Sequence, residues 1–96
     1  MPNTLHNHNY SGVTTFNDGH FHRYAGTTSM DPDVPGHAHT MMGETSFEDG
    51  HIHMYSLYTS PEIETEDGHT HYYQSQTSFN DGHVHYLYGY NTVYRY

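Results

Sequence analysis

The tripeptide His-x-His occurs six times in this chain, and the six copies account for all twelve histidines of the protein. Residues two apart on a β-strand share a face, so both rings of each pair should point to the same side. Since no histidine stands outside a pair, we interpret the rest of the chain as the scaffold that presents these pairs. They are His6 and His8, His20 and His22, His37 and His39, His51 and His53, His69 and His71, and His83 and His85.

The pairs recur at a regular spacing. They begin at residues 6, 20, 37, 51, 69 and 83, so short steps of 14 residues alternate with long steps of 17 and 18. A fixed internal period is the mark of a repeat architecture. The spacing predicts a single all-β domain over residues 1–96, built from three units of about 31 residues with six His-x-His strands.

A chain of this composition needs a stabilising element in addition to its hydrophobic core. It has 96 residues, of which 32% are apolar, so its own core is small. Domains of this kind usually depend on disulfides, on metal ions or on oligomerisation. Because the chain contains no cysteine, metal and self-assembly remain as candidates.

Tight turns separate the expected strands. Asp-Gly, a strong turn pair because glycine adopts positive φ at no steric cost, stands at 18–19, 49–50, 67–68 and 81–82. The long steps, 25–36 and 56–68, carry prolines and acidic residues and are predicted to be exposed loops. Glycine or proline interrupts every window that could otherwise form more than one helical turn.

The strand period assigns two faces. The residue two positions after each pair is large, should share the histidine face and could wall it off from water. These residues are Tyr10, Tyr24, Met41, Tyr55, Tyr73 and Leu87. The opposite face of the second, fourth and sixth strands is predicted to form the apolar core, whereas that of the odd strands should be more exposed. The predicted core residues are Phe16, Phe21, Phe47, Ile52, Phe79 and Val84.

The C-terminal segment 86–96 breaks the pattern, because it has no histidine and its tyrosines mostly alternate. It is predicted to be an additional strand. One interpretation is a closing strand that covers the domain's own sheet. The other is an edge strand that pairs with a second copy of the chain.

The pairs have the chemistry of a transition-metal site. Imidazole suits Zn, Cu, Fe, Ni or Co, whereas Ca and Mg prefer oxygen ligands. Twelve histidines could form three tetrahedral four-His sites or two octahedral six-His sites, within one chain or between chains. The turn aspartates are interpreted as turn residues that could orient a histidine ring rather than as ligands. The alternative is that the histidines merely decorate a solvated sheet face.

The charge excludes several partners. Eleven acidic residues face two arginines and no lysine, which argues against nucleic acid and anionic membranes. No apolar run is long enough for a membrane span, and no signal peptide is visible. The localisation stays open, and the absence of cysteine fits an extracellular one.

The repeated string Asp-Gly-His-x-His-x-Tyr resembles the hallmark of the YmaF-like family of small bacterial proteins. It stands here as DGHFHRY (18–24), DGHIHMY (49–55), DGHTHYY (67–73) and DGHVHYL (81–87), and GHAHTM (36–41) and HNHNY (6–10) are degenerate copies. The pairs alone are also similar to those in the tips of phage long tail fibres, where three chains ring iron ions. That likeness implies octahedral sites and threefold or pseudo-threefold symmetry.

We therefore expect a metal-binding structural protein, not an enzyme, that self-assembles into a homo-oligomer or an extracellular filament. One alternative is a soluble metal-sequestration or buffer protein, and another is a phage or virion fibre component. An enzyme of the cupin type would combine one such pair with a distinct lone ligand, whereas these six pairs are near-equivalent copies.

Overall fold

The computed structural model describes residues 4–80 and 82–95. Within them the chain forms eleven short β-strands joined by turns and loops, and no helix. This confirms the predicted all-β class of short strands and tight turns. The prediction that each His-x-His pair forms a strand is wrong in detail, because among the histidines only His6 and His69 lie within a strand. Within the same residues, accordingly, no helix is long and apolar enough to cross a membrane. The strands are β1 (Leu5–His6), β2 (Asn9–Val13), β3 (Arg23–Thr27), β4 (Asp31–Pro32), β5 (Thr40–Glu44), β6 (Met54–Tyr58), β7 (Ile63–Glu64), β8 (Gly68–Thr70), β9 (Tyr72–Gln76), β10 (Tyr86–Tyr90) and β11 (Tyr94–Arg95).

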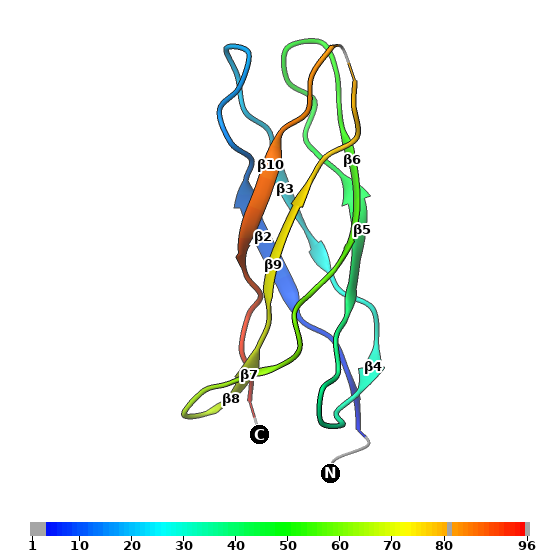
Figure 1. Cartoon of the computed structure of the whole chain (residues 1–96), viewed down its shortest axis with the longest axis vertical. Helices are drawn as coiled ribbons and strands as arrows, with labels where there is room; N and C mark the ends of the chain where they lie inside the picture. The colour runs from blue at the N-terminus through cyan, green and yellow to red at the C-terminus, as the bar shows by residue number, and fades with distance from the viewer. Residues whose placement is uncertain (1–3, 81, 96) are drawn as a thin grey trace.

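Three antiparallel hairpins form the body of the molecule. Hairpin 1 pairs β2 with β3, hairpin 2 pairs β5 with β6, and hairpin 3 pairs β9 with β10. They stand side by side along the long axis of a rod with extents of 45 × 20 × 17 Å (Figure 1). Because β3 packs beside β5, β6 beside β9, and β10 beside β2, the three hairpins close into a ring.

Neighbouring hairpins are joined by backbone hydrogen bonds beyond the two ends of their strands. Near the turns, one such bond links each hairpin to the next: Ser46 N to Arg23 O (2.8 Å), Ser78 N to Met54 O (2.8 Å) and Thr15 N to Tyr86 O (2.9 Å). Near the termini the corresponding bonds are Ser29 N to Thr40 O, Ser60 N to Tyr72 O and Thr92 N to Asn9 O. The three links at each end give the rod a pseudo-threefold axis.

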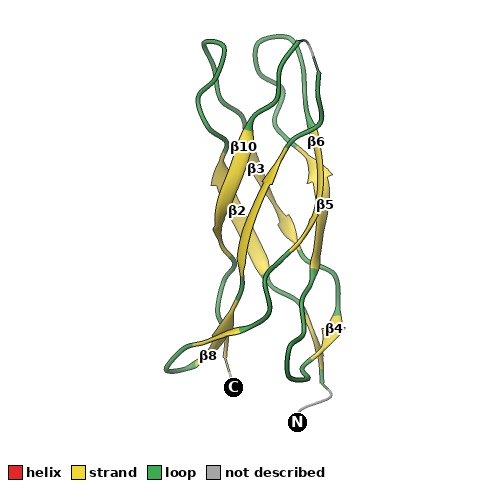
Figure 2. Cartoon of the chain, in the orientation of Figure 1, coloured by secondary structure: helices red, strands yellow, loops and turns green. Residues whose placement is uncertain are grey.

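The far end of the rod from the termini, which we call the tip, carries the three hairpin turns (Figure 2). In the first turn Asp18 and Gly19 both have positive φ, 56° and 84°, as a type I′ turn requires. The second turn repeats this geometry, which confirms the Asp-Gly prediction at both places. Asp81, in the third turn, lies outside the described residues.

The base, where the two termini lie, departs from the sequence prediction. The long steps were expected to be exposed loops, but they contain β4 and β7, which pair with β1 and β8. Gly68 does not form a positive-φ turn, because it begins β8 and its backbone is extended against β11. The segment 86–96 is not one additional strand. Tyr86–Tyr90 is the return strand of hairpin 3, Tyr94–Arg95 is β11, and Tyr96 lies outside the described residues.

The apolar core lies on the histidine face. All six large residues that follow the His-x-His pairs are buried, together with Leu57. The predicted core on the opposite face is wrong: Phe16, Phe47 and Phe79 are 69–73% exposed, Phe21 is exposed, and Ile52 and Val84 are half-buried. The physical reason is that three hairpins closed into a ring enclose only their inner face, and no second layer covers the outer one.

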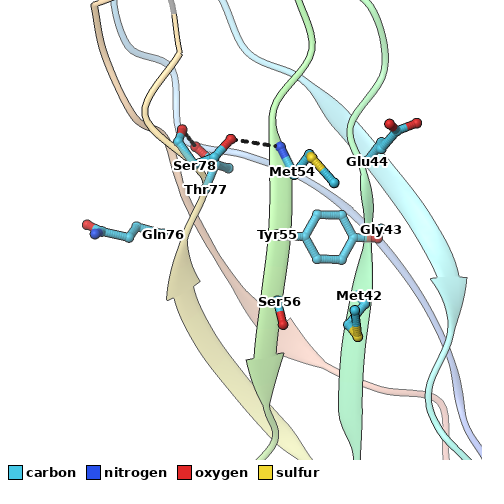
Figure 3. Close-up of a pocket in the computed structure, with 9 residues that line it drawn as sticks. All are labelled: Met42, Gly43, Glu44, Met54, Tyr55, Ser56, Gln76, Thr77 and Ser78. Atoms are coloured by element: carbon cyan, nitrogen blue, oxygen red, sulfur yellow. Dashed lines mark hydrogen bonds between the residues drawn. The ribbon is translucent and has the colours of Figure 1, made fainter.

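Within the core, each buried tyrosine lies over a glycine on the paired strand. The pairs are Tyr10 with Gly26, Tyr24 with Gly12, Tyr55 with Gly43, and Tyr73 with Gly89. Figure 3, a view of the open groove between hairpins 2 and 3, shows the Tyr55 ring reaching over Gly43. Where the facing residue has a side chain, the tyrosine is replaced by a smaller residue: Met41 faces Leu57, and Leu87 faces Ser75.

The tyrosine hydroxyls join the hairpins at the centre of the rod. Tyr10 and Tyr55 share a hydrogen bond of 2.9 Å, and so do Tyr24 and Tyr73. Each bond links hairpin 1 to one of the other two hairpins. A buried hydroxyl without a hydrogen-bond partner would lower the stability of the fold, so these two hydrogen bonds allow the tyrosine rings to fill the core.

The substitution Gly43→Leu is expected to destabilise the protein by about 3 kcal/mol, at the upper end of overpacking costs. A Cβ at Gly43 would lie 2.6 Å from the Tyr55 hydroxyl oxygen, so the ring would have to leave its place. Adding Tyr55→Met should recover part of the loss, because the double variant copies the Met41–Leu57 pair. Urea unfolding of both variants measures this, and a double variant no more stable than Gly43→Leu would contradict the account.

Candidate metal centres

The twelve histidines gather into two clusters of six. The first, third and fifth pairs meet in the base cluster, and the second, fourth and sixth meet in the tip cluster. In each cluster every residue offers one ligand atom, and these atoms all lie within 4.8 Å of one another. The base cluster is His6, His8, His37, His39, His69 and His71, and the tip cluster is His20, His22, His51, His53, His83 and His85. Of the two divisions that the sequence left open, the structure adopts two groups of six.

Threonine hydroxyls fix the backbone of the second histidine in most pairs. The His22 amide donates to Thr14 Oγ1 at 3.0 Å, while the Thr14 amide donates to the His22 carbonyl at 2.8 Å. The same reciprocal pair recurs between His53 and Thr45, His85 and Thr77, His8 and Thr28, and His39 and Thr59. These bonds tie five of the six pairs to the other arm of their own hairpin and so set where the rings point.

Backbone carbonyls then fix the ring of that second histidine. Its Nδ1 lies 2.7–3.0 Å from a carbonyl oxygen in all six pairs. The acceptors are Thr92 for His8, Ser46 for His22, Ser29 for His39, Ser78 for His53, Ser60 for His71 and Thr15 for His85. A carbonyl can only accept, so Nδ1 carries the proton and Nε2 of the neutral ring presents its lone pair.

Acceptors also face the first histidine of several pairs. His20 Nδ1 lies 3.2 Å from the Asp18 carbonyl oxygen and 3.4 Å from Asp49 Oδ2, and His83 Nδ1 lies 3.3 Å from Asp18 Oδ2. Two turn aspartates thus orient rings, as the sequence suggested. Asp67 does not, because it pairs with Arg95 at 2.8 Å.

Carboxylates that the sequence reasoning did not single out serve the base cluster. Asp31 Oδ2 lies 3.0 Å from His39 Nδ1, and Glu62 Oε1 lies 3.7 Å from His37 Nδ1. Both come from the long steps that were predicted to be loops. Partners of this kind orient the rings and raise the basicity of imidazole ligands.

The Nε2 atoms converge in a way that the histidines alone do not explain. His51 and His53 Nε2 lie 3.0 Å apart, and His20 and His85 Nε2 lie 3.1 Å apart. Each of these four rings has a carbonyl oxygen beside its Nδ1, which places the ring proton there, so each short contact brings together two Nε2 atoms that carry no proton. In the base cluster, Nε2 atoms are buried without a hydrogen-bond partner in His8, His39 and His71.

An octahedral cation fits this arrangement. With metal–nitrogen bonds of ~2.1 Å, adjacent ligand atoms of an octahedron are ~3.0 Å apart and opposite ones ~4.2 Å apart. The short Nε2 separations of 3.0–3.3 Å match the adjacent distance, and the opposite distance falls within the 4.8 Å that encloses all six ligand atoms. A tetrahedral ion would use four of the six rings and leave two buried lone pairs unpaired. Each cluster could therefore hold one metal ion with six imidazole ligands.

Burial keeps several of these rings neutral. Desolvation lowers the pKa of His8 to about 3 and that of His71 to about 4. It also lowers the pKa of His22, His39, His53, His69 and His85. Metal ligation requires neutral imidazole. At neutral pH these seven rings are thus in the ligating state before any ion arrives.

One feature of the repeat was missed in the sequence. A threonine, or Asn91 in the last copy, stands six residues after the second histidine of every pair, and a serine or threonine follows it. The first residue caps the backbone of a histidine in its own hairpin, except at His71, whose carbonyl accepts from the Asn91 amide. The second supplies the carbonyl for a ring in the next hairpin. The constant spacing of six was the available signal.

Fold and clusters together define a small all-β repeat protein, rich in histidine, with two candidate metal centres. The chain belongs to the YmaF family. The family model, described as spore germination protein GerY/YamF, matches residues 1–60 and again 37–93, and the overlap of the two matches reflects the internal repeat. Neither a curated protein nor a solved structure matches the chain.

Proposed function

We propose that the protein binds two transition-metal ions, one in each histidine cluster, and that the ions hold its three hairpins together. The observation that carries the proposal is the convergence of six histidine ligand atoms in each cluster, with Nε2 atoms as close as 3.0–3.1 Å in the tip cluster. Unprotonated nitrogens at that distance repel one another. A cation at the centre attracts all six nitrogens, and this attraction outweighs the repulsion between them. Each ion then links all three hairpins, because each hairpin supplies one pair to each cluster.

The coordination number favours Fe(II), Co(II) or Ni(II). Imidazole suits Zn, Cu, Fe and Ni, but structural zinc is almost always tetrahedral and Cu(II) prefers a tetragonal field. Six imidazoles at near-equal separations suit an ion that accepts a regular octahedron. Affinity still follows the general order among divalent metals, so zinc and copper belong in any binding experiment.

A structural role is the form of this proposal that the site supports best. Six protein ligands leave no open position for a substrate, which is the feature of structural rather than catalytic metal sites. The model of the family carries the description spore germination protein GerY/YamF. For this chain we propose a metal-stapled structural component connected with spores, not an enzyme and not primarily a soluble metal buffer.

The test is the metal content of the purified chain, measured by elemental mass spectrometry after loading with each candidate metal. Two equivalents per chain are expected. The triple variant His22→Ala/His53→Ala/His85→Ala should keep only the base ion, and His8→Ala/His39→Ala/His71→Ala should keep only the tip ion. Three equivalents, or none, would overturn the proposal.

Self-assembly is a second candidate role. Tyr86, Tyr88 and Tyr90 are exposed in a row on β10, and three phenylalanines are exposed near the tip. Exposed aromatic surface of this kind is typical of interaction sites. We propose that such contacts build a homo-oligomer or an extracellular filament from metal-loaded rods. Electron microscopy and size-exclusion chromatography at high concentration test this, and a monodisperse loaded monomer would contradict it.

A further inference from the structure

We infer that the two metal sites serve different purposes: the base cluster retains its ion, whereas the tip cluster exchanges its ion with solution. This inference rests on the proposed function, since it assumes that both clusters bind metal. It adds to it an exchangeable site that the structural role does not require. The chain would thus hold one tightly retained structural ion and one ion whose occupancy follows the concentration of free metal in solution.

The base cluster is enclosed on all sides. Its six histidines are at most 7% exposed. Besides the three hairpins, five short strands, β1, β4, β7, β8 and β11, lie at this end of the rod (Figure 1). They supply acidic acceptors behind the rings, such as Asp31. An ion could leave this cluster only after part of that shell had opened.

Tyr94 closes the base cluster at its outer end. Its ring lies against the His6 ring, with centroids 4.4 Å apart and a tilt of 33°, and 5.6 Å from the His69 ring. Strand β11 holds it there through pairing with β8, and the adjacent Arg95 is anchored to Asp67. Tyr94 touches the ligands and not the ion, so we treat it as a positioning residue that controls access.

Among the residues that the structure describes at the tip, none covers the cluster there as Tyr94 covers the base cluster. His20, His51 and His83, the first histidines of its pairs, are only partly buried, while the second histidines are fully buried. The nearby Phe16, Phe47 and Phe79 side chains are about 70% exposed and therefore do not form a lid. Water can reach the three outer rings, which is the first requirement for replacing a ligand during exchange.

Acidic side chains stand at this opening. Asp18 and Asp49 are 67% and 65% exposed while lying 3.3–3.4 Å from ring Nδ1 atoms of the outer histidines. An outer ring that swings away from the ion stays beside a carboxylate. Negative charge in solvent also raises the local concentration of cations. Both effects should speed metal entry and exit at the tip relative to the base.

The experiment follows isotope exchange on the intact chain. The protein is loaded with natural-abundance Ni²⁺, freed of unbound metal and mixed with excess ⁶²Ni²⁺, and bound isotopes are counted over time. We expect two phases of one equivalent each, with rates at least about tenfold apart, or ~1.4 kcal/mol in activation free energy. In His8→Ala/His39→Ala/His71→Ala the fast phase should remain. In His22→Ala/His53→Ala/His85→Ala the slow phase should remain.

The cap is tested by Tyr94→Ala, which should speed the slow phase about tenfold and leave the fast phase unchanged. Tyr94→Phe, which keeps the ring, should leave exchange slow, and Tyr88→Ala is the matched control at an exposed tyrosine that belongs to neither cluster. Two equivalents that exchange at one rate, or a slow phase assigned to the tip, would overturn the inference and leave the proposed function standing. A chain that binds no Ni²⁺ or other candidate metal would overturn the proposed function itself.

Discussion

Removing both metal ions is expected to unfold the chain or to lower its melting temperature by roughly 30 °C or more. An ion present at a thousandfold excess over its dissociation constant stabilises the folded state by about 4 kcal/mol, so two ions contribute about 8 kcal/mol. The total stability of a small domain is about 5–15 kcal/mol. For small domains a change of 1 kcal/mol shifts the melting temperature by about 4–8 °C.

The apolar core is too small to replace that contribution. Only seven apolar side chains are buried among the described residues, and four of them are tyrosines. Without a cation, each cluster also buries converging lone pairs, which disfavours the closed ring of hairpins.

Circular dichroism melting curves of the loaded and chelator-treated chain measure the effect. Adding back Ni²⁺ or Fe²⁺ should restore the loaded curve, and Mg²⁺ should not, because it prefers oxygen ligands. Superimposable curves with and without metal would show that the hairpins stand by their own packing. In that case the staple is not needed.

The inner face of the protein could be predicted from the sequence because it depends on local geometry. A strand places residues i, i+2 and i+4 on one face whatever the rest of the fold does. That rule puts His20, His22 and Tyr24 together, and the structure buries Tyr24 and clusters the rings. The type I′ turns were equally local, since Asp-Gly at 18–19 and 49–50 specifies them.

The location of the core could not be predicted in the same way, because it depends on how the hairpins associate. Three apolar residues between histidines and three nearby phenylalanines suggested a second buried face. In a flat sheet they could have packed under another layer. In a closed ring of three narrow hairpins the outer face has no partner, so Phe16 stays exposed.

The division of the pairs into two clusters also lies beyond the reach of spacing. Alternate pairs, such as those at 6 and 37, meet only because each hairpin runs the length of the rod and returns. The alternation of 14-residue and longer steps is the trace of that path: a short step goes over a hairpin turn at the tip, and a long step crosses to the next hairpin at the base.

Acid is expected to release both ions and unfold the chain as the pH falls from about 6.5 towards 4. Burial lowers the folded-state pKa of seven histidines. The pKa of His8 falls to about 3 and that of His71 to about 4. In the unfolded chain a histidine titrates near 6.5. Below that pH the unfolded state binds more protons than the folded state, so the free energy of unfolding falls as the pH falls.

The loss is large because it is shared by many sites. Each buried ring with a strongly lowered pKa costs up to about 1.4 kcal/mol per pH unit below 6.5, so His8 and His71 alone remove on the order of 6 kcal/mol by pH 4. Protons also compete with the metal for Nε2, which adds to the effect. Circular dichroism and bound-metal measurements across the pH range should show a transition steeper than that of one histidine. The midpoint pH of this transition tells protonation of the histidines from protonation of the carboxylates, because unperturbed Asp and Glu protonate near 4. A loaded chain that keeps its fold and both ions down to pH 4 would contradict the assignment of the twelve histidines to the two metal sites.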